Sequence, residues 1–365
     1  MADLINCDGD EVLVATFLYH FHGLGQIDFS SLKPDDLTEV QELAAAQDLE
    51  VLPTVYLRRG ALPWFAETLR IYHRLRSVGC LPNIAGFGVE GPLLGPQGGI
   101  PRAGRWFPTG DEWRTIASLG SLGLRYVVMA PDAMELDDEV EPGINFADVL
   151  VAFYEQGIRI ALGHFHRDNP QRSACRIRDV LGFLHGRYAS SPYLVLTDHL
   201  YNDMPRAFVH AWRTPAERAR REVELGAFLA HDWETSDLTV LLGPVPATML
   251  AAAREDLLMP CINFDGYHVD LDICRRTFDY LGADRLIALT DHTEVPVMAS
   301  ERLIRDDSTG LWLRDDGAVA AGTTGHCQQR ANMRACGLSD QAVEKLFLTN
   351  PRAAIAYDVR SAAVR

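Results

Sequence analysis

Positive charge is scarce in this sequence. Its 365 residues include 34 Lys and Arg against 50 Asp and Glu, which gives a formal net charge of −16 at pH 7 and a pI of about 5.1. A surface that binds nucleic acid needs clustered Lys and Arg to neutralise phosphates. The composition therefore argues against a nucleic-acid partner, whereas it says little about a small-molecule substrate.

Paired cysteines and long hydrophobic runs are also lacking. The seven Cys are scattered without a Cys-x-x-Cys pair, so we expect reduced thiols and neither a disulfide framework nor a zinc finger. The segment Met1–Asp10 is acidic and lacks the basic-then-apolar layout of a signal peptide. No apolar run is long enough to span a bilayer. These features predict a cytoplasmic protein without a membrane partner.

Two glycine-rich segments lack the residues that would make them nucleotide sites. Gly23–Gly25 has no GxGxxG completion, and no helix is expected directly after it. Gly322–Gly325 resembles a phosphate-binding nest, but no Walker lysine follows it. A dinucleotide-binding fold or a P-loop is therefore unsupported.

Alternating strand-like and helix-like segments fill the chain, which is 47% hydrophobic. Such alternation predicts a parallel sheet covered by helices, and eight strands predict a single (β/α)₈ TIM-type barrel spanning residues 1–365. The eight strands are expected at Val12–Tyr19, Val51–Leu57, Ile84–Val89, Arg125–Ala130, Gly157–Gly163, Tyr193–Thr197, Met259–Asp265 and Asp284–Asp291.

Two segments do not fit the eightfold repeat. Thr239–Leu242 is one strand candidate too many, and we assign it to an insertion at residues 201–256 that would form a lid. Leu311–Val319 contains Asp-Asp-Gly and predicts a small hairpin.

Polar groups end several of the predicted strands. Any one of them is more often a turn carboxylate or a structural histidine than a metal ligand, but five at four strand ends are difficult to attribute to chance. Parallel strands of a barrel end at one face, where such side chains can bind a metal ion. The five are His20, His22, Glu90, His164 and His199.

Asp291 follows the last strand. A carboxylate there can take a proton from water and pass it to a leaving nitrogen, so Asp291 is the predicted general base. His268 and His292 are candidates for substrate contacts, whereas a supporting role and a surface position are equally open for His166.

These motifs, in this order, resemble those of the amidohydrolase superfamily and specifically of the N-acetylglucosamine-6-phosphate deacetylases. The resemblance covers roughly residues 14–357. Its motifs are HxHG at His20–Gly23, EGP at Glu90–Pro92, GH at Gly163–His164, HLYNAM at His199–Met204 with one change, DGxH at Asp265–His268, and TD at Thr290–Asp291.

The resemblance implies a metal centre. By it, Glu90, His164 and His199 would be the principal ligands, and His20 and His22 would bind a second ion that some relatives lack. Zn²⁺ is the expected metal, with one or two ions, and Fe²⁺ or Mn²⁺ would suit the same ligands.

The resemblance also implies a reaction, the hydrolysis of an acetamide to acetate and an amine. Asn202 and the backbone of Asp203 would hold the sugar, His268 would polarise the acetyl carbonyl, and Asp291 would be the acid and base. Barrels of this family pair, so we expect a homodimer.

Several departures from the family pattern bear on the substrate. The chain leaves no room for the family's accessory β-sandwich, so we expect a bare barrel. Asp203 replaces the family's Ala. The position at which the family has an arginine that binds the 6-phosphate is occupied by His210, with Arg213 close by. A position that is usually His is Arg102, which could reach the partner's active site in a dimer.

The leading hypothesis is therefore a metal-dependent N-deacetylase that acts on an N-acetylated amino sugar, either the 6-phosphate or a non-phosphorylated relative from specialised metabolism. Another activity of the superfamily, a cyclic amidase or a deaminase, is one alternative. A catalytically inactive barrel kept for binding is another, although retention of Glu90, His164, His199 and Asp291 together argues against it.

Overall fold

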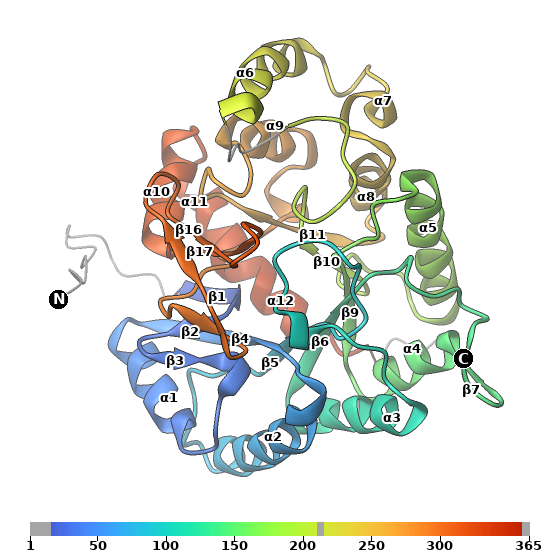
Figure 1. The fold of residues 1–365 in the computed structure, drawn as a ribbon, viewed down its shortest axis with the longest axis vertical. Coiled ribbons are helices and arrows are strands. Elements are labelled where there is room, and N and C mark those ends of the chain that lie inside the picture. The colour runs from blue at the N-terminus through green and yellow to red at the C-terminus, as the bar shows by residue number, and fades with distance from the viewer. Residues whose placement is uncertain (1–15, 210–214, 360–365) are drawn as a thin grey trace.

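A parallel sheet forms the centre of the protein. The structure, a computed structural model, describes residues 16–209 and 215–359. Eight strands follow one another in chain order around the sheet (Figure 1). They are β1 (Thr16–Phe21), β4 (Leu49–Tyr56), β5 (Phe87–Glu90), β6 (Leu124–Met129), β9 (Arg159–Leu162), β10 (Leu196–His199), β11 (Met259–Asn263) and β12 (Ile287–Leu289).

Two backbone hydrogen bonds join the first strand to the last. The amide of Asp291 donates to the carbonyl of His20 at 3.0 Å, and the amide of His22 donates to the carbonyl of His292 at 2.9 Å. The sheet therefore closes at the carboxyl ends of its strands. The predicted (β/α)₈ barrel is confirmed, with a strand at each predicted segment, although residues 12–15 of the first predicted strand lie outside the described residues.

Amphipathic helices cover the outer face of the sheet. The α3 helix begins with a capping box, in which the Thr109 hydroxyl accepts from the Glu112 amide and the Glu112 carboxylate accepts from the Thr109 amide. No helix in the described ranges is long and apolar enough to cross a membrane. The helices are α1 (Asp36–Ala46), α2 (Leu62–Ser77), α3 (Gly110–Ser118), α4 (Phe146–Glu155), α5 (Pro170–Arg187), α6 (Pro215–Ala230), α7 (Leu238–Leu242), α8 (Pro244–Arg254), α9 (Leu271–Leu281), α10 (His326–Ala335), α11 (Asp340–Glu344) and α12 (Asn350–Ala356).

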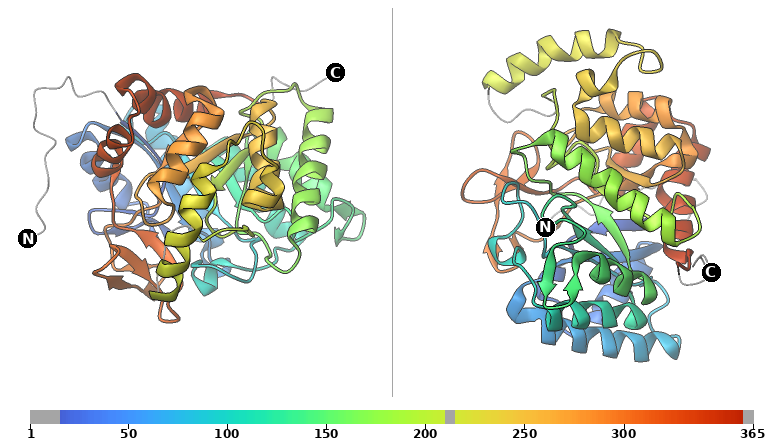
Figure 2. Two further views of the ribbon diagram at one scale, coloured as in Figure 1. Left: turned by 90° about the horizontal axis from the view of Figure 1, so that it is seen from above. Right: turned by 90° about the vertical axis from the view of Figure 1, so that its right-hand side faces the viewer.

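The segment between β10 and β11 holds three of these helices. Residues Thr239–Leu242, considered above as a surplus strand, lie in α7, because the Asp237 side chain caps the Thr239 amide and Gly243 ends the turn. The α6 helix lies at the edge of the molecule (Figures 1 and 2). It packs beside α9, because the guanidinium of Arg276 on α9 donates to the carbonyl of Leu229 on α6 at 2.6 Å. A lid at 201–256 stays a prediction.

Strands outside the barrel form small sheets. Strand β2 (Gly23–Leu24) pairs with β3 (Ile27–Asp28), β7 (Glu139–Glu141) with β8 (Ile144–Asn145), and β13 (Val297–Met298) with β14 (Glu301–Arg302), and β15 (Ile304–Asp306), β16 (Leu311–Leu313) and β17 (Val319–Gly322) form a three-stranded sheet. The predicted hairpin is thus confirmed, with β15 as a third strand. The β17 strand reaches the barrel, because the Gly322 amide donates to the Asp291 carbonyl at 2.7 Å. That one domain spans 1–365 without a β-sandwich stays a prediction.

The expectation of reduced cysteines holds for most of the described ones. Cys261 and Cys274 are buried and free, and Cys80, Cys175 and Cys336 are also free. Cys327, in contrast, is disulfide-bonded, which corrects the expectation for that residue. Scattered spacing could not reveal a single bond of this kind.

The barrel interior is packed by large side chains, and Gly88 makes room for one of them. A Cβ atom at Gly88 would lie 2.2 Å from Cζ of Tyr126. We predict that Gly88→Ala lowers the free energy of unfolding by about 1–3 kcal/mol, as overpacking does. Gly182→Ala on exposed α5, where a Cβ meets nothing within 4 Å, should instead raise it by about 0.5–1 kcal/mol. Chemical denaturation compares the two, and equal stabilities would contradict the packing.

Candidate metal centre

Six predicted site residues meet at the carboxyl ends of the barrel strands. They come from β1, β5, β9, β10 and β12 or from the residue directly after a strand or one beyond it. Each is at most 2% exposed: His20, His22, Glu90, His164, His199 and Asp291. The structure therefore brings together every metal ligand that the sequence predicted, together with the predicted base.

The backbone is unusual at three of these residues. His20 has a φ angle of 57°, His164 of 48° and Asp291 of 45°. Such left-handed conformations cost non-glycine residues about 1–3 kcal/mol each and persist only where the surroundings impose them. Here they turn each side chain inward at the point where its strand ends.

The ligand atoms form two neighbouring groups. Within each group they lie within 4.8 Å of one another. Glu90 reaches both groups, because one of its oxygens contacts Nε2 of His164 and the other lies 3.1 Å from Nε2 of His20 and 3.3 Å from Nε2 of His22. The first group is Glu90, His164, Asp198 and His199, and the second is His20, His22 and Asp291.

Several of these buried atoms make no hydrogen bond in the described part of the chain and have the spacing expected of ligands around a metal ion. Within the described ranges, Nε2 of His20, Oε2 of Glu90 and both oxygens of Asp198 have no hydrogen-bond partner. Ligands around a tetrahedral ion with bonds of about 2.1 Å lie about 3.4 Å apart, close to the separations seen here. The mixture of imidazole and carboxylate donors fits Zn²⁺, Fe²⁺ or Mn²⁺. A divalent ion is therefore compatible with the residues present.

Strand residues from the barrel interior orient the ligands. The hydroxyl of Tyr126 lies 3.1 Å from Nδ1 of His20, and Nδ1 of His22 lies 3.3 Å from the carbonyl of Thr54. A proton on Nδ1 of His22 leaves its Nε2 lone pair for a metal. Sequence reasoning missed Tyr126 and Thr54, because such residues in a buried strand resemble ordinary core.

Charges in the cluster compensate one another when no ion is bound. Burial raises the pKa of the Asp291 carboxyl, but the hydrogen bond from His22 and the nearby His199 and His268 outweigh burial and lower that pKa to about 2. Burial lowers the pKa of His22, whereas Asp291 and Glu90 raise it to about 10. His22 is thus held in its charged form, and a metal ion would replace that positive charge.

His268 lies beside the predicted base. Its Nε2 is 3.3 Å from Oδ2 of Asp291, and its Nδ1 is 2.6 Å from Oδ2 of Asp265. The other oxygen of Asp265 accepts from the amides of Tyr267 and His268. This turn fixes the ring so that Nε2 points toward Asp291, and the role of Asp265 was not predicted.

The substituted residue of the HLYN motif packs behind a ligand. Oδ2 of Asp203 lies 3.4 Å from Nδ1 of His164, and Arg167 contacts the same carboxylate. Asn202 is also buried, and its backbone N–H donates to the His199 carbonyl at 3.1 Å. The Asp203 side chain therefore supports His164, a position that the sequence did not indicate.

Comparison with solved structures gives the same architecture. The structures of N-acetylglucosamine-6-phosphate deacetylases from Pasteurella multocida, Mycobacterium smegmatis and Thermotoga maritima match with TM-scores of 0.67, 0.62 and 0.63. Sequence identities are 15%, 19% and 16%, over 96% of this chain and 78%, 80% and 81% of theirs. The chain has the fold of these deacetylases. No protein-family model and no curated protein sequence matches it.

The sequence predicts three further substrate contacts, Arg102, His210 and Arg213. His210 and Arg213 lie outside the described residues. Arg102 is 55% exposed and pairs with Asp315 at 2.7 Å, so within its own chain it binds the tip of the β16–β17 hairpin. A role for Arg102 in a partner's site stays a prediction.

The two remaining histidine candidates, His166 and His292, belong to neither ligand group. His292 stacks on Phe21 at a ring separation of 5.4 Å, and burial lowers the pKa of His292 to about 3. The His166 amide donates to Asp132 at 3.2 Å. His292 therefore packs in the core.

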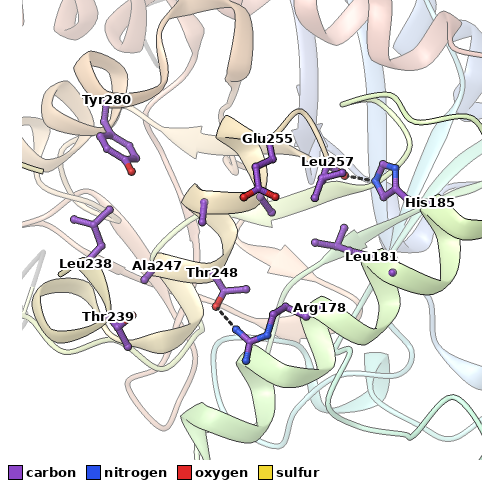
Figure 3. A pocket seen from close by; sticks show the side chains of 13 residues that line it. Arg178, Leu181, His185, Leu238, Thr239, Ala247, Thr248, Glu255, Leu257 and Tyr280 are labelled. Atoms are coloured by element: carbon purple, nitrogen blue, oxygen red, sulfur yellow. Dashed lines mark hydrogen bonds between the residues drawn. The ribbon is translucent and has the colours of Figure 1, made fainter. Parts of the chain in front are cut away.

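A cavity of about 560 Å³ lies between α5, α7 and α8 on the outside of the barrel (Figure 3). His185 and Arg178 on α5 line it, but their side chains bind Leu257 and Thr248. None of the metal-cluster residues lines this cavity, so the candidate site is separate from it.

The geometry predicts which histidines bind metal. After dialysis against Zn²⁺, the wild-type protein should retain metal, and His164→Ala or His199→Ala should weaken binding at least about 10²-fold, because each loses a bond to the ion. His73→Ala on the exposed face of α2 is the matched control and should bind as the wild type does. Elemental analysis measures the content, and undiminished metal in both ligand variants would contradict the site.

Proposed function

We propose that the protein is a metal-dependent N-deacetylase that hydrolyses the acetamide of an N-acetylated amino sugar. The observation that carries the proposal is the convergence of Glu90, His164 and His199 with Asp291 and His268 in one buried cluster at the strand ends. The fold shared with the N-acetylglucosamine-6-phosphate deacetylases supports it. Zn²⁺, a cytoplasmic location and a homodimer are parts of the same proposal.

A divalent ion in such a site supplies acidified water and polarises a carbonyl. Asp291 is placed to accept the proton of the attacking water, because its carboxylate lies among the histidine ligands, with Oδ1 3.2 Å from Nε2 of His22. The same carboxyl then returns the proton to the leaving nitrogen. One residue thereby serves as base and then as acid.

His268 completes the reaction centre. Asp265 accepts from Nδ1 of His268 and so orients the ring, and a proton on Nε2 would let His268 donate to the carbonyl oxygen. This donor would stabilise the oxyanion that develops on attack. Asp265 is then a positioning residue.

A cavity that contains several arginines lies next to Asp203 and could receive the part of the substrate that does not react. A cavity of about 530 Å³ is lined by Gly98, Arg102, Arg105 and Arg314, and Gly98 packs against the carboxylate of Asp203. Arg105 donates to the Gly95 carbonyl at 3.3 Å. Asp316 also lines the cavity and pairs with Arg102 and Arg314, which leaves Arg105 as the counter-charge for an anionic group of the substrate.

The main alternative, a cyclic amidase with a metal-bridging lysine, is disfavoured. Lys33 and Lys345 are the lysines of the chain. Lys33 is exposed, and Lys345 contacts Asp284 at the surface. Neither lies in the ligand groups.

The base can be tested by one substitution. Asp291→Asn keeps the shape of the side chain but cannot accept the proton, so kcat for acetate release should fall about 10²-fold or more. The ion held by Glu90, His164 and His199 should remain. Asp279→Asn on exposed α9, which breaks only a pair with Arg275, is the control with unchanged kcat. A wild-type rate for Asp291→Asn would assign the base to another group.

Substrate specificity can be tested by comparing kcat/KM for N-acetylglucosamine and its 6-phosphate. A phosphate is held best by a free arginine fork. The expected arginine is replaced by His210, and Arg206 already donates to the Tyr201 carbonyl at 3.2 Å. We predict that the non-phosphorylated substrate is turned over at least as well. A strong preference for the phosphate would contradict this, and its loss in Arg105→Ala would locate the phosphate in the basic cavity.

A further inference from the structure

Asp198 is a buried carboxylate that no predicted role explains. It directly precedes His199 on β10 and is 1% exposed. Within the described ranges neither of its oxygens has a hydrogen-bond partner. A buried carboxylate is costly unless positive charge compensates it, and the charged neighbours of Asp198 are imidazole nitrogens at 3.1–3.5 Å.

The two oxygens of Asp198 face different histidines. Oδ2 lies 3.1 Å from Nε2 of His164 and 3.2 Å from Nε2 of His199, whereas Oδ1 lies 3.5 Å from Nε2 of His20. Around one ion, ligand atoms are separated by about 3.4 Å. Each oxygen of Asp198 is therefore at ligand spacing from a different group of histidines.

The backbone of β10 is built to place this side chain. The register of β10 against β11 shifts between Leu196 and His199, and the hydroxyl of Thr197 accepts from the Cys261 amide at 2.9 Å in the irregular stretch. Such an irregularity lets two consecutive residues, Asp198 and His199, reach the site.

Space for Asp198 comes from the neighbouring strand end. A Cβ atom at Gly163 would lie 2.3 Å from Cβ of Asp198 and 2.7 Å from its Oδ2. Any side chain at position 163 would therefore clash with Asp198, and only glycine leaves room for this carboxylate.

We propose that Asp198 is a metal ligand that bridges two divalent ions, one held with His164 and His199 and the other with His20 and His22. Glu90 spans the same two groups, so two carboxylates connect the ions. Glu90, Asp198 and Asp291 together carry three negative charges when ionised, of which one divalent ion compensates two. The proposal rests on the metal dependence of the proposed function but not on its substrate.

Metal titration of Asp198→Asn tests the proposal. The amide keeps the side chain's shape but loses the charge and one oxygen donor. We expect the wild type to bind two Mn²⁺ or Zn²⁺ ions per chain, measured by calorimetry and elemental analysis, and Asp198→Asn to bind the second at least about tenfold more weakly. Asp132→Asn is the matched control, since Asp132 is also buried and follows a strand, but it binds Ser173 and the His166 amide. It should bind two ions as the wild type does.

Folding of the variants is checked by circular dichroism, and Asp198→Ser is titrated in parallel in case the amide is not tolerated. Two ions bound with wild-type affinity in either folded variant, or a single ion in the wild type, would overturn the proposal. Because the readout is metal binding, its outcome is separate from that of the acetate assay. A protein that binds two ions through Asp198 but releases no acetate would refute the deacetylase and leave this inference intact.

Discussion

The burial of three carboxylates among four imidazoles is the constraint on which the site depends. Glu90, Asp198 and Asp291 are each at most 2% exposed, and such groups are stable only when paired or bound to metal. Their positions require the barrel to close at that edge, which the backbone bonds between β1 and the residues after β12 achieve. The closure of the barrel therefore sets both the burial of these carboxylates and their spacing as ligands.

Local irregularity accompanies this arrangement at the strand ends. The left-handed backbone of His20, His164 and Asp291 and the register shift in β10 each depart from regular strand geometry. Barrels place functional groups at this face, where the loops leave the sheet. The small β15–β17 sheet is attached at this face, because β17 hydrogen-bonds to the Asp291 carbonyl.

The sequence predicted the barrel because buried parallel strands read as short apolar runs with helical segments between them. It predicted the ligands because charged groups at the ends of such runs are rare. It did not predict Asp198, whose neighbour His199 accounted for the motif, nor Tyr126, which resembles core. Thr239–Leu242 was ambiguous because a short apolar run fits either a strand or a helix. In the structure the Asp237 side chain caps the segment, which forms the helix α7.

The position of the bound metal is the most direct test of the proposed metal centre. Crystals grown with Zn²⁺ or Mn²⁺ and measured at the metal absorption edge give the ion positions from anomalous scattering. We predict strong peaks enclosed by Glu90, His164 and His199 and, beside them, by His20 and His22. Peaks only at the protein surface, with the cluster still folded as described, would contradict it.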